Sequence, residues 1–166
     1  MPTNLYGPND NYHPENSHVM AALIRKFCKA VINNEKNVTC WGSGNPMREF
    51  MHVDDLADAV VFSLKNWNLD LENAPLDKNG KKLTYLNVGT GKDISIKELS
   101  LKIAKASGFK GEIIWDKTKP DGVPKKQLNI SRIRSLGWES KIDLESGIKN
   151  TVKEYQQNLL NMKTTK

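Results

Sequence analysis

The spacing of apolar residues switches repeatedly between the helical and the strand-like period, and this switching limits the folds that the chain can adopt. A stripe of apolar residues at every fourth position predicts a helix over about 17–34, with Ser17 as its candidate cap. Short extended segments are predicted at 38–41 and 49–52. The first of them ends in the turn-forming segment 42–46.

The same alternation continues through the rest of the chain. Residues 85–88 are predicted to form a strand, and the capping box at 95–98 starts a helix that ends at Gly108. Another strand is predicted at 112–115, and a last helix begins at about Leu144. Short strands that alternate with helices favour a mixed α/β architecture.

A further helix is predicted directly after Asp54, and its apolar residues lie on one face. We expect that face to be buried in the core. It consists of Leu56, Ala57, Val60, Val61 and Leu64. The polar segment 66–82, which contains Pro75 and Asn79-Gly80, is predicted to be a loop.

Composition excludes several classes of protein. The 166 residues are 38% hydrophobic and 27% charged, which is typical of a globular domain, and no apolar run is long enough to span a membrane. Cys28 and Cys40 form no CxxC pair, and the start of the chain lacks a secretory signal, so a cytoplasmic protein with reduced thiols is expected. The three histidines lack zinc-like spacing, so no metal site is predicted.

The net charge of +6 leaves two classes of ligand to consider, nucleic acids and phosphorylated small molecules. The basic residues gather at 78–82, at 117–126 and from Lys163 onward. No zinc-finger, RNP or helix-turn-helix signature accompanies them. We therefore expect no nucleic-acid partner, and most of these lysines are expected to lie on a solvated surface.

Two motifs of a complete dinucleotide-dependent reductase are absent. The glycine pairs at 89–91 and 42–44 lack the third glycine of a phosphate-binding turn, because Ile94 and Met47 stand at that position. No tyrosine is followed four residues later by lysine, the pair that would form the acid/base of a short-chain reductase. We therefore expect the chain alone to be inactive.

Four segments together resemble a known family: PTNLYGP at 2–8 with NSH at 16–18, WGSGNPMREFMHVDD at 41–55, NVGTG at 87–91 and KPDGVPKK at 119–126. The chain resembles the C-terminal half of the GDP-L-fucose synthases, which belong to the extended short-chain dehydrogenases/reductases. The family epimerises GDP-4-keto-6-deoxy-D-mannose and reduces its ketone with NADPH, so it combines isomerase and oxidoreductase chemistry. The resemblance covers nearly the whole chain.

The resemblance implies roles for individual residues. The cofactor-binding residues for NADP would be Pro2, Thr3, Asn4, Leu5 and His18. The GDP-sugar-binding residues would be Lys26, Trp41, Arg48 and Asp121. His18 is also the candidate catalytic acid of the epimerisation, because an unperturbed histidine titrates near neutral pH.

A structural alternative stands beside each of these roles. Arg48 could form a surface ion pair with Glu49, and Trp41 could be a core or rim aromatic. Asp121 could close a turn without contacting a ligand. His18 could simply cap its helix. Whether Arg25 or Lys26 faces the ligand stays open, since many relatives carry arginine at the position of Lys26.

Other charged residues are expected to be structural. Asp54 and Asp55 lie where carboxylates complement the dipole at the start of a helix. His52 lies in an alternating extended segment and is expected to have no catalytic role.

The resemblance also implies a domain arrangement. Residues 1–166 would form one substrate-binding region with a remnant of the Rossmann sheet, and the N-terminal Rossmann domain would be absent. Segments 1–8, 49–66 and 85–91 would pack on that domain in the full enzyme. The family's homodimer helices lie largely in the absent half, so that dimer is not expected here. Whether the chain is an excised domain or a natural short form stays open.

Two other functions are consistent with the residues. The chain could be part of another NAD(P)-dependent epimerase or dehydratase that acts on UDP- or dTDP-sugars, since the RxFxHVDD type of segment recurs among such enzymes. It could also be a non-enzymatic binding module with a basic surface.

Overall fold

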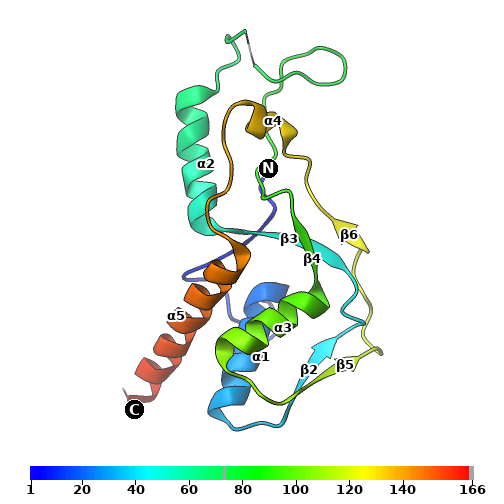
Figure 1. Ribbon diagram of the computed structural model, residues 1–166, viewed down its shortest axis with the longest axis vertical. Coiled ribbons are helices and arrows are strands. Elements are labelled where there is room, and N and C mark those ends of the chain that lie inside the picture. The colour runs from blue at the N-terminus through cyan, green and yellow to red at the C-terminus, as the bar shows by residue number, and fades with distance from the viewer. Residues whose placement is uncertain (73, 165–166) are drawn as a thin grey trace.

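The computed structural model describes residues 1–72 and 74–164 and has the mixed α/β fold expected from the sequence (Figure 1). The elements in chain order are β1 (Asn4–Tyr6), α1 (Val19–Ile32), β2 (Asn37–Trp41), β3 (Met47–His52), α2 (Val53–Asn66), β4 (Asp93–Ser95), α3 (Ile96–Ser107), β5 (Glu112–Asp116), β6 (Lys125–Lys126), α4 (Ser131–Ser135) and α5 (Leu144–Thr164).

Two small sheets organise the strands. In the first, β1 and β6 both pair with β3 in parallel, and β4 pairs with it antiparallel. In the second, β2 and β5 form a parallel pair. β3 therefore connects the two ends of the molecule, as the cyan strand across the middle of Figure 1 shows.

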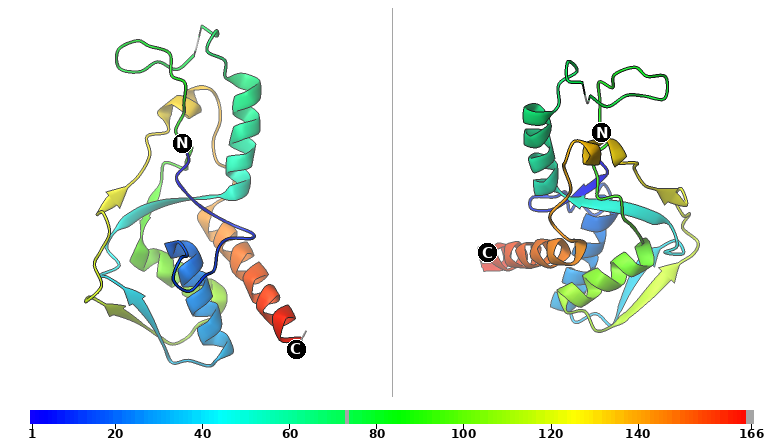
Figure 2. Two further views of the ribbon diagram at one scale, coloured as in Figure 1. Left: turned by 180° about the vertical axis from the view of Figure 1, so that it is seen from behind. Right: turned by 45° about the horizontal axis from the view of Figure 1, so that its top comes forward.

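One end of the molecule, which we call the three-helix region, consists of α1, α3 and α5 with the β2–β5 pair (Figures 1 and 2). The predicted capping box starts α3, and Gly108 ends it with a left-handed φ of 81°. The helices share one apolar core, which is buried from solvent. It includes Leu23, Ile24, Phe27, Leu99, Ile103, Ile148 and Val152.

The other end, which we call the α2 region, consists of α2, α4 and the segments 1–3 and 85–88. A smaller apolar cluster that includes Ile133 and Trp138 holds it together. The second view of Figure 2 shows α2 standing at the edge of the molecule.

The expected burial of the α2 apolar face is wrong for this structure. Val60 and Val61 are each 50% exposed and Leu64 is 82% exposed, whereas Asp55 and Ala59 are the buried residues of the helix. The stripe is apolar as predicted, but only Leu56 packs on the apolar cluster of this region, and Ala57, Val60, Val61 and Leu64 are exposed. A hollow of about 480 Å³ lies along this face, and its lining includes Leu64, Trp67 and Tyr85.

Two further predictions, one strand and one helix start, are also wrong. Residues 85–88 form no strand, because Val88 alone bridges to Pro2 and a strand needs a continuous partner. The first helix begins at Val19, and its N-cap is His18 rather than Ser17. The helical ladder starts at the His18 carbonyl, which accepts a 2.9 Å hydrogen bond from the Ala22 amide.

Candidate functional site

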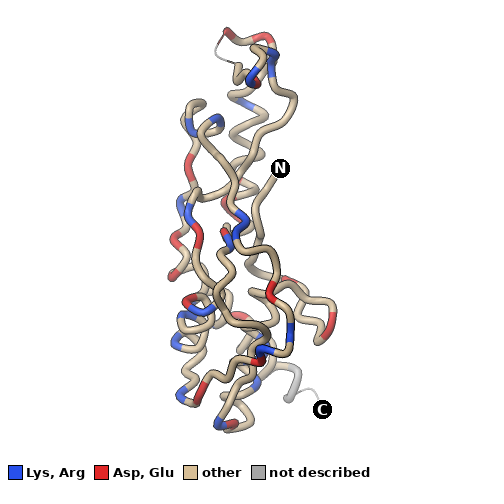
Figure 3. Tube along the Cα trace, turned by 90° about the vertical axis from the view of Figure 1, so that its right-hand side faces the viewer, with Lys and Arg blue, Asp and Glu red and all other residues tan. Residues whose placement is uncertain are grey.

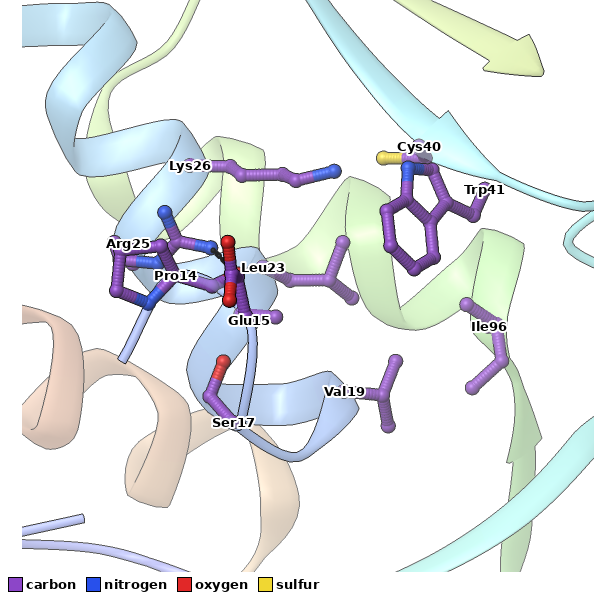
Figure 4. Close-up of a pocket in the computed structure, with 11 residues that line it drawn as sticks. Pro14, Glu15, Ser17, Val19, Leu23, Arg25, Lys26, Cys40, Trp41 and Ile96 are labelled. Carbon is purple, nitrogen blue, oxygen red and sulfur yellow. Dashed lines mark hydrogen bonds between the residues drawn. The ribbon is translucent and has the colours of Figure 1, made fainter. Parts of the chain in front are cut away.

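An exposed tryptophan lines two hollows beside the three-helix region. Trp41, at the end of β2, is 67% exposed. Hollows of about 260 Å³ and about 200 Å³ adjoin it, and both are lined by Val19, Trp41 and Ile96. We call the two hollows together the Trp41 groove. Figure 4 shows the larger hollow, with apolar side chains below and basic side chains beside it.

Lys26 extends from α1 toward the indole of Trp41 (Figure 4). Its Nζ lies 5.5 Å from the centroid of the ring and donates a 2.8 Å hydrogen bond to the Thr39 carbonyl. Burial lowers the pKa of Lys26, and the neighbouring Arg25 adds to this, while Cys40 opposes it. The side chain is thus fixed at one wall of the groove.

Arg25 lines the same hollow but is bonded elsewhere. Its Nη2 donates a 3.1 Å hydrogen bond to the Pro14 carbonyl. Of this pair, Lys26 is therefore the residue whose charged group reaches the Trp41 ring.

Arg48 lines the smaller hollow, on the far side of Trp41. Its Nη1 donates a 2.7 Å hydrogen bond to the Met47 carbonyl, and a Cβ added to Gly122 would lie only 2.9 Å from Nη2. The guanidinium thus lies against a glycine backbone, and any larger residue would crowd it.

The alternative of an Arg48–Glu49 surface ion pair is wrong. Successive residues of a strand point to opposite faces, and Glu49 is fully buried at 0% exposure on the other face of β3. Among the described residues, no ion pair joins it to Arg48.

Asp121 also lines the smaller hollow, and it closes a turn at the same time. Its carboxylate accepts hydrogen bonds from the Ser43 amide at 2.8 Å and the Ser43 hydroxyl at 2.6 Å. These bonds, the hydroxyl first, lower the pKa of Asp121. Gly42 must be a glycine here, since its φ is +77° and an added Cβ would lie 2.3 Å from the carboxylate.

The residues expected to touch the cofactor lie outside the groove lining. His18 is exposed, caps α1 without a side-chain hydrogen bond, and lines neither hollow, although Ser17 and Val19 beside it do. Thr3 and Asn4 line neither hollow. The Thr3 hydroxyl and the Asn4 side-chain amide both donate hydrogen bonds to the Glu49 carbonyl, at 3.2 and 2.7 Å. The structure thus gathers the four predicted sugar-nucleotide residues but not Pro2–Leu5 and His18.

Glu49 is a residue whose importance the sequence did not reveal. Its buried carboxylate accepts backbone hydrogen bonds from Thr90, Gly91 and Leu128, at 2.6, 2.7 and 2.9 Å. It thereby joins β3 to two distant segments. An acidic residue inside a strand that also carries Phe50 and Met51 was the only signal, and a sequence alone does not say what such a residue bonds.

These bonds also bear on the glycine turn at 89–91. A dinucleotide pyrophosphate is held by free backbone amides of a glycine-rich turn. The Thr90 and Gly91 amides already donate to Glu49. This turn therefore does not fit a pyrophosphate.

His52, Asp54 and Asp55 lie at the start of α2, where the sequence placed the two carboxylates. The His52 side chain accepts a 3.2 Å hydrogen bond from the Asp54 amide at the start of α2. Asp55 additionally accepts from the Lys141 and Ile142 amides, both at 3.0 Å, and so ties α2 to the segment before α5.

Neither a metal site nor a membrane span is found in the part of the chain that the structure describes. Within residues 1–72 and 74–164, no three histidine, cysteine, aspartate or glutamate side chains are grouped so that they could hold a metal ion. No helix in these ranges is long and apolar enough to cross a membrane.

Comparison with known sequences gives matches along nearly the whole chain. Residues 1–74 match the model described as the NAD dependent epimerase/dehydratase family. Over 163 residues, which are 98% of this chain and 46% of the relative, the sequence is 45% identical to the probable GDP-L-fucose synthase 1 of Oryza sativa subsp. japonica. The chain spans about half the length of the curated relatives it matches.

Solved structures agree with these matches. A GDP-6-OMe-4-keto-L-xylo-heptose reductase from C. jejuni is 33% identical with a TM-score of 0.80, over 95% of this chain and 53% of that one. A GDP-L-fucose synthetase from Naegleria fowleri bound to NADP is 26% identical with a TM-score of 0.79, over 96% of this chain and 46% of that one. The resemblance found in the sequence is confirmed: over nearly its whole length the chain is similar to about half of a GDP-L-fucose synthase, and its first 74 residues match the epimerase/dehydratase model.

Proposed function

We propose that this chain is the C-terminal, GDP-sugar-binding part of an NADP-dependent GDP-L-fucose synthase. That enzyme converts GDP-4-keto-6-deoxy-D-mannose to GDP-L-fucose by epimerisation and reduction. One observation carries the proposal: Lys26, Trp41, Arg48 and Asp121 come from separate segments and line one groove. These are the four residues that the resemblance assigns to the GDP-sugar.

The groove has the chemistry that a sugar nucleotide requires. An exposed indole offers a flat apolar surface to a base or a sugar. The Arg48 guanidinium can donate forked hydrogen bonds to a diphosphate, and the Lys26 ammonium adds a second positive charge. Asp121 keeps its charge, since its pKa is lowered, and can accept hydrogen bonds from hydroxyl groups.

We propose that this chain supplies only some of the contacts to the cofactor. NADP supplies the hydride that reduces the ketone. In this proposal Pro2–Leu5 and His18 touch the cofactor, while the part of the enzyme that relatives carry beyond this chain holds its pyrophosphate. The engagement of the 89–91 amides by Glu49 supports that division. His18 then stands beside the groove as the candidate proton donor.

The exposed apolar face of α2 supports the same division of the enzyme. We infer that Val60, Val61 and Leu64 pack against the dinucleotide-binding half, together with the segments 1–8 and 85–91. Helices that flank parallel strands normally bury their apolar stripe. Both cysteines are free and buried, which is in keeping with the cytoplasmic location that we also propose.

Calorimetric titration tests the binding proposal. We expect GDP to bind more tightly than UDP, and Arg48→Ala to weaken GDP binding at least tenfold, because a charge-assisted contact to the diphosphate is lost. Arg132→Ala is the matched control. Arg132 lines neither hollow of the groove, and its side chain donates a hydrogen bond to the Leu76 carbonyl. A preference for UDP would instead favour a different nucleotide-sugar epimerase or dehydratase.

The alternative of a basic nucleic-acid-binding module has less support. In the side view of Figure 3, basic and acidic segments are interspersed along the chain, without a continuous basic face in that view. Binding of a short oligonucleotide that weakens steeply with salt, together with unchanged binding in Arg48→Ala, would support that alternative over ours.

A further inference from the structure

A lysine that the resemblance assigns to nothing lies over the Trp41 ring; Lys119 lines neither hollow itself, but Pro120 beside it lines the smaller one. The Nζ of Lys119 is 5.5 Å from the centroid of the Trp41 ring, the same distance as the Nζ of Lys26. The two ammonium groups reach the indole from different segments, Lys26 from α1 and Lys119 from the loop after β5.

The loop that carries Lys119 is held at both of its ends. On one side, the Lys119 amide donates a 3.2 Å hydrogen bond to the Asp116 carbonyl. On the other side, Asp121 accepts two hydrogen bonds from Ser43, and the Pro124 carbonyl accepts a 2.7 Å bond from Met47. The loop backbone is therefore held next to Trp41 before any ligand arrives, which reduces the entropy lost on binding.

The charges around the groove are unbalanced. Among the described residues, no ion pair ties Lys26, Arg48 or Lys119 to a carboxylate. Of the acidic residues that line the groove, Asp121 is engaged by Ser43, and Glu15 is an exposed residue of the larger hollow. Asp116 lines neither hollow and is bonded to Thr118, although its charge acts on Lys119. Two ammonium groups over one exposed aromatic ring and a guanidinium in the adjoining hollow therefore favour an anionic ligand.

We propose that Lys119 is a further binding residue of this site and contacts the diphosphate of the nucleotide together with Arg48. The proposal rests on the proposed function, since it takes a nucleoside diphosphate as the ligand. Arg48 and the Pro120–Gly122 segment next to Lys119 line the same smaller hollow. A phosphate group there would meet a forked guanidinium from β3 and a compact ammonium from the loop.

Calorimetry with three probes tests the contact: GDP, guanosine and inorganic pyrophosphate. Lys119→Met should weaken GDP and pyrophosphate binding about tenfold and leave guanosine binding unchanged, because the lost contact is to phosphate. Lys119→Arg should retain binding, which a purely structural role in the loop would not require. Lys117→Met is the control, since it removes an exposed lysine from the same loop.

The outcomes separate this inference from the proposed function. If GDP binding needs Arg48 but is unchanged in Lys119→Met, the inference fails and the proposed function stands. If pyrophosphate binding needs Lys119 while GDP is bound no better than UDP, the inference stands as a phosphate contact and the proposed nucleotide is wrong. If the chain binds neither GDP nor pyrophosphate, both are overturned.

Discussion

The three-helix region and the α2 region differ in how far their helices are covered. In the first, α1, α3 and α5 bury a shared core around Phe27, Leu99 and Ile103. In the second, α2 buries Ala59 and Asp55 but leaves Val60, Val61 and Leu64 exposed. The apolar stripes of α1 and α2 look alike in the sequence. An apolar stripe in the sequence therefore predicts which face of a helix needs a packing partner. It does not predict whether the same chain supplies that partner.

The largest expected difference between the regions is in the free energy of unfolding. Phe27→Ala should lower it by about 3–5 kcal/mol, because it leaves a cavity in a packed core. Leu64→Ala should change it by less than about 0.5 kcal/mol, because that side chain already faces solvent. Urea unfolding of both variants measures the two values. Similar losses in both would break the comparison.

The junction between the regions depends on Glu49. Glu49→Gln should lower the free energy of unfolding by about 1–3 kcal/mol. The glutamine NH2 group would face backbone N–H groups that now donate hydrogen bonds to the carboxylate. Hydrogen exchange should speed up at Thr90, Gly91 and Leu128. Glu112→Gln, on the exposed edge of β5, is the control and should leave both measurements unchanged.

Two glycines compare the turn beside the proposed site with the loop that follows α2. Gly42 and Gly80 have φ near +78°, but an added Cβ would clash with Asp121 at Gly42 and meets open space at Gly80. Gly80→Ala should therefore show only the backbone cost, about 1–2 kcal/mol, and Gly42→Ala should cost more. Only Gly42→Ala should weaken GDP binding. Equal losses in unfolding free energy would mean that the Asp121–Ser43 turn gives way freely.

The smallest expected effect is a pH dependence in the three-helix region. Burial raises the pKa of the Cys28 thiol from 9.0 to about 12. The folded state then keeps a proton that the unfolded state releases above about pH 9, so stability is full below pH 9 and falls as the pH rises toward 12. Cys28→Ala should flatten this slope in urea unfolding between pH 7 and 10. An unchanged slope would mean that the thiol is not sealed from water.

The sequence predicted most of the three-helix region because its signals are local. The capping box of α3, the strand at 112–115 and the long last helix depend on neighbouring residues, and the structure contains all three. The strand predicted at 85–88 failed because a strand depends on a distant partner, and only Pro2 bridges to Val88. The buried face of α2 failed for the same reason.

The candidate site was predicted through the resemblance and not through the spacing of its residues. Nothing local indicates that Lys26, Arg48 and Asp121 lie around Trp41, since the fold brings them from separate segments. Glu49 was missed because its partners are backbone amides up to 79 residues away. The roles of the site residues in binding are proposals, while their convergence is a property of the fold.

The position of Trp41 also gives the groove an optical signal. Trp41 is exposed, whereas Trp138 is buried and both Trp67 and Trp115 are partly buried. A ligand that lies against the indole and displaces nearby ammonium groups would change the emission of this one residue far more than that of the others. The chain thus carries an intrinsic fluorophore at its proposed binding site, and Trp41→Phe would give the matching blank.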